Sequence, residues 1–140
     1  MSVYLDTSVV DPFFLVDSFA DRARVFLATK PSDLMVSDLA SAEFCDVVGR
    51  RLRSGALQLS EARTAIANFD SWKSQYALPL ETLPSDIQSV EAFLKRLDLV
   101  LRAPDAIHIS SAQRLGAELA TFDQRMAECA RALGVVVAPL

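Results

Sequence analysis

Expected strands alternate with stretches of helical spacing along the whole chain. Strands are expected at residues 3–5, 34–36, 80–83, 119–122 and 135–137. Between them, apolar residues recur at intervals of three and four, as on an amphipathic helix. This alternation predicts a mainly parallel sheet covered by helices and joined by right-handed crossovers. We therefore expect one α/β domain over residues 1–140, built as a three-layer sandwich.

Capping and helix-ending residues set the expected helix boundaries. Pro104 suits a first helical turn, where its missing N–H has no partner to lose, and Gly55 and Gly116 follow the last apolar positions of their helices. Residues 6–8 are expected to form a polar turn, followed by an apolar stretch that Asp11-Pro12 breaks. Helices are expected at 21–29, 60–76, 104–116 and 123–134, and Pro31 closes the first of these. A further helix is expected to begin at a cap at 37 or 38 and to end at 55, and another is expected to begin at a capping box at 85–88.

Length and composition are those of one globular domain. With 140 residues, 51% of them hydrophobic, the chain buries about two thirds of its unfolded surface on folding. No stretch approaches the roughly 20 apolar residues of a membrane span, and Asp6 and Asp11 interrupt the apolar run that a signal peptide needs. We expect a cytoplasmic protein with no membrane segment. Cys45 and Cys129 lack C-x-x-C spacing and lie in helical patterns, so we expect small buried side chains rather than a disulfide.

Acidic residues lie at the same end of several expected elements. Asp6 and Asp123 end strands, Asp105 begins a helix, and Glu43 lies about one turn into another. In an open parallel sheet these ends meet at one edge, where ligands bind. Each acid alone is better explained as a turn former or helix cap than as a ligand. Several acids beside apolar runs favour a shared cation, because an unpaired carboxylate is costly to bury.

Carboxylates gathered at one edge suit Mg²⁺ or Mn²⁺, which bind oxygen ligands and retain water. Such an ion can activate a water molecule, polarise a phosphodiester and stabilise the leaving oxygen, so no His or Cys nucleophile is required. The formal charge of −4 agrees with this interpretation, because setting aside the four acids leaves 14 acidic and 14 basic residues. The excess negative charge can lie entirely in a site that cations neutralise.

Two other classes with this architecture lack a required residue. A phosphate-accepting receiver domain needs a lysine near a late strand, and the only lysines are Lys30, Lys73 and Lys95. A phosphatase of the haloacid-dehalogenase type needs a second aspartate two residues after the first, and that position is Ser8. Both classes are therefore excluded.

Four segments together carry a resemblance to a known family. They are Val-Tyr-Leu-Asp-Thr-Ser at 3–8, Ser-Ala-Glu-Phe at 41–44, Pro-Asp-Ala-Ile-His at 104–108 and Ala-Thr-Phe-Asp at 120–123. In this order they resemble the signature segments of the PIN-domain family, and within it the chain is similar to VapC-type toxins of bacterial toxin–antitoxin pairs. The resemblance covers nearly the whole chain. It implies an endoribonuclease acting on structured RNA, a divalent metal, a homodimer and a cognate antitoxin that blocks the site.

The resemblance also implies roles for individual residues. The catalytic acids would be Asp6, Glu43, Asp105 and Asp123. The surest metal ligands would be Asp6 and Asp105, with Asp123 binding directly or through water. Three hydroxyls are candidates for orienting the carboxylates or are simple caps; they belong to Thr7, Ser8 and Thr121.

Basic residues near the site leave alternatives open. Arg102, three residues before Asp105, either contacts a phosphate or is a solvated surface arginine. His108, the only histidine, lies one turn after Asp105, and a structural role is favoured over that of a catalytic base. The three arginines within residues 50–53 either bind RNA or complement a helix dipole. A nuclease outside a toxin pair and an inactive PIN-like interaction module also remain as alternatives.

Overall fold

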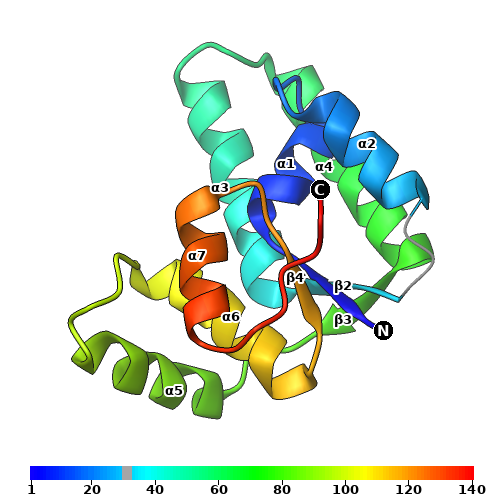
Figure 1. The fold of residues 1–140 in the computed structure, drawn as a ribbon. Coiled ribbons are helices and arrows are strands. Elements are labelled where there is room, and N and C mark those ends of the chain that lie inside the picture. The colour runs from blue at the N-terminus through cyan, green and yellow to red at the C-terminus, as the bar shows by residue number, and fades with distance from the viewer. Residues whose placement is uncertain (30–32) are drawn as a thin grey trace.

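The computed structural model describes residues 1–29 and 33–140, in which four parallel strands form one sheet (Figure 1). The strands are β1 (Val3–Leu5), β2 (Leu34–Ser37), β3 (Ala77–Leu80) and β4 (Glu118–Ala120). Their order across the sheet is β3-β2-β1-β4, and every pairing is parallel. The predicted α/β class, with a mainly parallel sheet covered by helices, is therefore confirmed.

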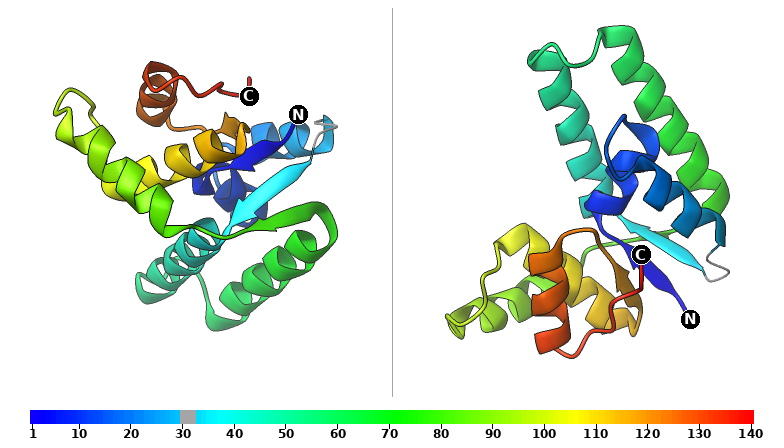
Figure 2. Two further views of the ribbon diagram at one scale, coloured as in Figure 1. Left: turned by 90° about the horizontal axis from the view of Figure 1, so that it is seen from below. Right: turned by 45° about the horizontal axis from the view of Figure 1, so that its top comes forward.

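Seven helices in the described residues cover the two faces of this sheet. They are α1 (Thr7–Phe14), α2 (Ala20–Thr29), α3 (Asp38–Arg53), α4 (Leu59–Tyr76), α5 (Pro84–Lys95), α6 (Ala103–Leu115) and α7 (Gln124–Ala132). Helices α1 to α4 lie on one side and α5 to α7 on the other, which gives the expected three layers (Figure 2). None of the helices in the described parts of the chain is long and apolar enough to cross a membrane.

The central strand β1 divides the interior into two cores because successive side chains of a strand point to opposite faces. Val3 and Leu5 pack in the core under α1 to α4, which includes Phe44. Tyr4 packs in the second core with Ile109 of α6. All of these side chains are fully buried. Strand β1 therefore packs against both helical layers, and these layers contain the helices that carry the acidic residues.

The largest difference from the sequence-based expectation is α1, which replaces the predicted polar turn and broken apolar stretch. Asp6 caps this helix, and its carboxylate accepts the Ser8 N–H at 3.4 Å. Pro12 costs an eight-residue helix only one internal hydrogen bond, while Val9 and Val10 become buried. Burial of the apolar face therefore outweighs the helix-breaking signal.

The third strand and the following helix both begin earlier than predicted. β3 spans 77–80 instead of 80–83, and it tolerates Pro79 because it lies at the sheet edge. The predicted capping box at 85–88 is wrong, since α5 begins at Pro84 and the Asp86 carboxylate accepts the Leu83 N–H at 2.9 Å. The shift matters because Asp86 thereby lies inside the helix, where it is buried.

The predictions for the last elements are also partly wrong. β4 ends at Ala120 rather than continuing to 122, and residues 135–137 contribute one isolated bridge, between Leu119 and Val137, instead of a strand. α7 ends at Ala132, two residues before the predicted end. The N–H of Phe122 bonds to a side chain of α1 rather than to another strand, so the ladder cannot extend.

Several smaller expectations can also be compared with the structure. Ser37, not Asp38, caps α3, because its hydroxyl accepts the Ala40 N–H at 3.0 Å. Cys129 is buried as predicted, but Cys45 is exposed on the outer side of α3, and both thiols are free. The predicted helix stop at Pro31 lies outside the described residues.

Candidate active site

The carboxyl ends of β1 and β4 meet the N-termini of α1, α6 and α7 at one edge of the sheet. The Asp6 N–H donates to the Ala120 carbonyl at 3.0 Å, which joins the two strand ends. Asp105 lies close enough to Asp6, Glu43 and Asp123 for their charges to shift its pKa. The structure therefore brings the four sequence-predicted acids to the same edge.

Asp6 is buried and held by hydroxyl groups. Its Oδ2 accepts hydrogen bonds from the Ser8 hydroxyl at 2.7 Å and from the Thr121 hydroxyl at 2.8 Å. The capping role allowed by the sequence is present, since Asp6 also caps α1. Both hydroxyls thus orient this carboxylate, and Thr121 does so from the strand end that precedes Asp123.

Glu43 reaches the site from the second turn of α3. Its Oε1 accepts the Thr7 hydroxyl at 2.8 Å and lies 2.5 Å from Nε2 of His108. Burial raises the pKa of Glu43, but the hydrogen bonds from His108 and Thr7 outweigh burial and hold it below its ordinary value. Glu43 is therefore ionised at neutral pH.

His108 is fully buried between Glu43 and Tyr4, whose hydroxyl lies 2.6 Å from Nδ1. The Tyr4 hydroxyl donates its proton to Ser37 at 2.9 Å, so its oxygen accepts from His108. Nε2 donates to Glu43 and lies 3.6 Å from Oδ1 of Asp6. Both ring nitrogens thus face an oxygen atom that can accept a proton, and this arrangement favours the imidazolium form.

The charges around His108 support this assignment. Burial lowers the pKa of the imidazole, but the hydrogen bond to Glu43 and the negative charge of Asp6 outweigh it, so the pKa lies above its ordinary value. The sequence favoured a structural histidine. The structure shows a buried cation that contacts two of the predicted acids.

Asp105 differs from the other acids because its carboxylate has no hydrogen bond or ion pair within residues 1–29 and 33–140. Burial and the neighbouring charges of Asp6 and Asp123 raise its pKa, and the positive charge of His108 offsets only part of this effect. Asp105 therefore occupies a position where a positive ion would be stabilising.

Asp123 caps α7, where its Oδ1 accepts the N–H groups of Arg125 and Met126 at 2.9 and 3.1 Å. Together with Asp105 and Arg102 it borders an open cavity of about 710 Å³. The remaining lining residues are Val100, Leu101, Gln124 and Arg125. Arg102 is exposed at the cap position of α6, so a ligand in this cavity would meet both carboxylates and guanidinium groups.

The donor set fits a hard divalent cation that keeps much of its water. Among the described residues, no three Asp, Glu, His or Cys side chains converge tightly enough to form a complete protein cage. Mg²⁺ does not require such a cage, since one or two carboxylates, waters and a substrate phosphate complete its coordination. Asp105 and Asp123 beside the cavity match that pattern, with Asp6 and Glu43 held behind them.

Asp11 and Tyr4 are site neighbours that the sequence analysis missed. Asp11 is half-buried, and its Oδ1 has no hydrogen-bond partner in the described part of the chain. Burial, followed by the charge of Asp6, raises the pKa of Asp11 to about 7. Because helix α1 was not predicted, no sequence pattern indicated that Asp11 lies near the site. Tyr4 had a signal, a hydroxyl inside a fully apolar strand.

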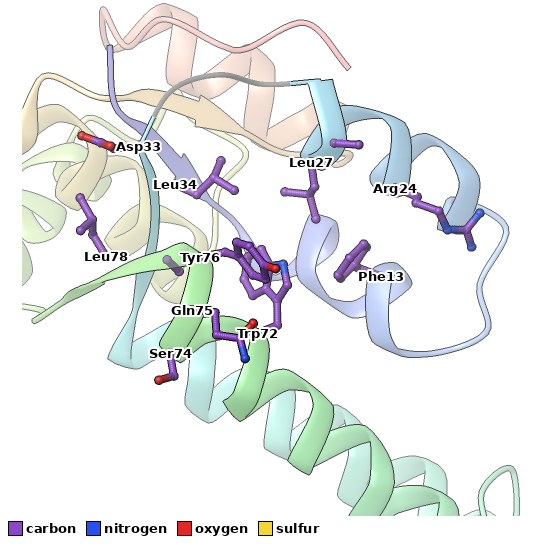
Figure 3. A pocket seen from close by; sticks show the side chains of 12 residues that line it. Phe13, Arg24, Leu27, Asp33, Leu34, Trp72, Ser74, Gln75, Tyr76 and Leu78 are labelled. Carbon is purple, nitrogen blue, oxygen red and sulfur yellow. The ribbon is translucent and has the colours of Figure 1, made fainter.

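The predicted arginine cluster and an apolar cavity both lie outside the acidic edge. Arg51 donates to the Val16 carbonyl at 3.1 Å and Arg50 lies 3.3 Å from Asp46, so these two arginines already have partners in the protein. A cavity of about 680 Å³ between α1, α2, α4 and β3 is lined mainly by apolar side chains, including Trp72 (Figure 3). It contains none of the four acids.

The fold and the site together define a class of protein: a small parallel α/β domain with an acidic site at the carboxyl edge of its sheet. Comparison with known proteins gives the family. The PIN domain model matches residues 3–132, and the chain belongs to the PIN domain family. It is 32% identical to ribonuclease VapC46 of Mycobacterium tuberculosis over 142 positions, which cover 99% of this chain and 98% of that protein.

Solved structures show the same fold over nearly complete chains. The chain matches VapC20 of M. tuberculosis, described as a sarcin–ricin loop cleaving toxin, with a TM-score of 0.77 at 20% identity, covering 99% of both chains. It matches a chain of VapBC2 from Rickettsia felis, solved with a promoter DNA fragment, with a TM-score of 0.71 at 15% identity, covering 99% of this chain and 98% of that one.

Proposed function

We propose that this chain is an endoribonuclease, the toxin of a toxin–antitoxin pair, that hydrolyses RNA phosphodiester bonds with Mg²⁺ or Mn²⁺ at the acidic edge. The observation that carries the proposal is the Asp105 carboxylate, which has no hydrogen-bond or ion-pair partner in the described part of the chain and lies with Asp123 beside an open cavity. The likeness to ribonuclease VapC46 over the full chain supports the same reaction.

Each acid has a distinct part in this proposal. Asp105 and Asp123 bind the cation from the cavity side, and Asp6 completes the negative site from its buried position. A bound Mg²⁺ or Mn²⁺ would supply Lewis acidity and lower the pKa of a water molecule. The hydroxyls of Ser8 and Thr121 keep Asp6 in one orientation, so the site needs little rearrangement.

Glu43 is suited to position or deprotonate the attacking water. Its Oε1 carries both hydrogen bonds, from Thr7 and His108, while 31% of the side chain stays exposed. The Oε2 atom can therefore accept a proton from water. The His108 imidazolium keeps Glu43 ionised, and Arg102 at the cavity rim can bind the phosphate.

The family relationship extends the proposal to partners. The relatives include a VapBC2 complex, so we propose that a cognate antitoxin inhibits this chain by placing a basic side chain, an arginine, among the carboxylates. If the metal and that antitoxin segment bind at the same time, this mode of inhibition is excluded. We further propose a cytoplasmic homodimer in which residues 1–140 form one PIN domain.

Two alternatives are distinguished by simple observations. A nuclease outside a toxin pair would lack an adjacent gene for a small DNA-binding protein. An inactive interaction module would not cleave RNA under any condition. The primary test is cleavage of RNA with Mg²⁺, with Mn²⁺ and in excess chelator. We expect cleavage only with metal and recovery when metal is restored, whereas undiminished cleavage in chelator would overturn the metal mechanism.

A further inference from the structure

A stacked aromatic pair lies directly beside the acidic edge. Phe122, between Thr121 and Asp123, stacks on Phe19 with ring centroids 4.7 Å apart and an interplanar angle of 14°. Every other aromatic ring pair in the described residues is tilted or edge-on. The guanidinium carbon of Arg22 lies 5.0 Å from the Phe122 centroid and 5.6 Å from that of Phe19.

This stack is connected to the proposed catalytic acids through one side chain. The Phe122 N–H donates to the Ser8 hydroxyl at 2.9 Å, and the same hydroxyl donates to Asp6 at 2.7 Å. A flat group bound on the stack would therefore be positioned relative to the acidic site.

The stack is held in place but is not covered. The Phe19 N–H donates to Asp17 at 2.9 Å, and Arg22 donates to the Leu140 carbonyl at 3.1 Å. Because Arg22 is nearly equidistant from two rings that are 4.7 Å apart, it lies beside the pair rather than over an outer face. Phe122 is buried, whereas Phe19 keeps 36% of its surface exposed. Part of Phe19 is therefore accessible from solvent.

We propose that Phe19, Phe122 and Arg22 form a binding site for one unpaired nucleobase of the RNA, next to the phosphate that is cut. This inference rests on the proposed function for the identity of the ligand. Single-stranded RNA is commonly bound by stacking of bases on aromatic rings and by arginine beside them, whatever the base. The base stacks on the open part of Phe19, and Arg22 faces its backbone phosphate.

The test measures binding in the cleavage-deficient Asp105→Asn background. The probe is a fluorescent single-stranded RNA with 2-aminopurine placed in turn at each position. We expect the 2-aminopurine fluorescence to be quenched at one position. Replacing that base by an abasic site should weaken binding roughly tenfold, which is within the range of one stacked base. Phe19→Leu should remove both the quenching and this penalty, whereas Phe19→Trp should retain both.

Val25→Ala is the matched control, because Val25 is an exposed apolar residue of α2, the helix that begins directly after Phe19, and it should leave binding unchanged. The abasic comparison on the parent protein needs no Phe19 variant, so it tests the site even if Phe19→Leu unfolds. Equal binding of abasic and intact RNA at every position, or an abasic penalty that persists in Phe19→Leu, would overturn the inference. A wild-type protein that shows the stacking pattern but cuts no RNA would instead overturn the proposed function alone.

Discussion

Asp86 of α5 and Asp105 of α6 are aspartates in two packed neighbouring helices, yet their surroundings are opposite. Asp86 is buried and accepts two hydrogen bonds from Arg114, at 2.8 and 3.0 Å, and one from Ser111 at 3.2 Å. Burial raises the pKa of Asp86, but these donors outweigh it and hold the pKa below its ordinary value. Asp105 has no such donors among the described residues, and its pKa is raised.

The comparison separates a structural carboxylate from a functional one. For Asp86 the protein itself provides the cation, in the form of Arg114. Around Asp105 the nearest charges are mainly negative, and the single buried imidazolium of His108 is already bonded to Glu43. This difference supports our proposal that Asp105 receives a cation from solution. Substitutions at the two positions should therefore have opposite consequences for activity and stability.

The largest expected effect is the loss of cleavage in Asp105→Asn. Removing the negative charge weakens cation binding where charge develops in the reaction, and we expect at least a roughly hundredfold lower rate. Asp70→Asn, which removes an exposed charge on α4, is the matched control and should cleave normally. Rates are measured on one RNA at saturating Mg²⁺. Full activity of Asp105→Asn would contradict the functional half of the comparison.

The second prediction is that Asp86→Asn, at the structural carboxylate, destabilises the protein. This change leaves the partly buried Arg114 without its counter-charge, and we expect a loss of about 2–3 kcal/mol in the free energy of unfolding, at the lower end for such pairs because Arg114 is partly exposed. Urea unfolding at pH 7 measures it. Since the folded pKa is lowered, the stabilisation is present above the ordinary pKa and is lost as the pH falls through the folded value. The difference from wild type should therefore shrink in acid.

The third prediction tests whether a carboxylate without a hydrogen-bond partner near the acidic edge lowers the stability of the folded protein. The pKa of Asp11 is raised to about 7, so the folded protein holds this proton between about pH 4 and 7 while the unfolded chain releases it. Stability is lost as the pH rises through that window. Asp11→Asn should therefore be more stable than wild type at pH 8, on the order of 1 kcal/mol after discounting for partial exposure, and equal near pH 4.

Urea unfolding at the two pH values measures the effect of Asp11→Asn, with the exposed Asp21→Asn as control. A constant difference between Asp11→Asn and wild type at both pH values would show that the pKa of Asp11 is not raised in the folded protein.

The smallest predicted effect concerns the buried side chain of His108, which lies beside the acids. Tyr4→Phe removes the oxygen that accepts the Nδ1 proton of His108 and leaves that N–H without a partner. We expect about 1 kcal/mol lower stability, because the buried hydroxyl loses two hydrogen bonds, one with His108 and one with Ser37, each worth about 0.5 kcal/mol. The free energy of unfolding is compared with that of Tyr76→Phe, which alters an exposed ring. No difference between the two variants would show that Tyr4 does not support His108.

The acidic edge could be predicted from the sequence because local order determines it. Asp6, Asp105 and Asp123 each follow a strand or begin a helix, and parallel strands bring such ends to one edge. The hydroxyl groups of Thr7, Ser8 and Thr121 could also be proposed as partners of the acids, but the buried hydrogen bonds of His108 could not be predicted, because they join distant positions. The link between Tyr4 and His108 joins residues 104 positions apart, and that between Glu43 and His108 joins residues 65 positions apart.

The missed elements have a related physical cause. Helix α1 contains Pro12 and is too short to form by propensity alone, so its stability comes from burying Val9 and Val10 in the tertiary structure. The predicted strand at 135–137 is apolar enough, yet only Val137 bridges to β4. In both segments, packing against other elements decides the conformation, and no local pattern reports such packing.

Our central claim is that Asp105 belongs to a cation-binding site. Thermal melts of wild type and Asp105→Asn, in chelator and in Mg²⁺, test this claim most directly. Asp105 is a better choice than Asp6, whose carboxylate caps α1 and accepts two hydroxyl protons. In chelator, Asp105→Asn should melt at the same temperature as wild type or higher, because neutralising one acid relieves repulsion.

Magnesium should then raise the melting temperature of wild type, with a stabilisation of about 2.7 kcal/mol at a hundredfold excess over the dissociation constant, and should raise that of Asp105→Asn much less. A variant that melts clearly below wild type in chelator, together with a wild type that Mg²⁺ leaves unmoved, would contradict the claim.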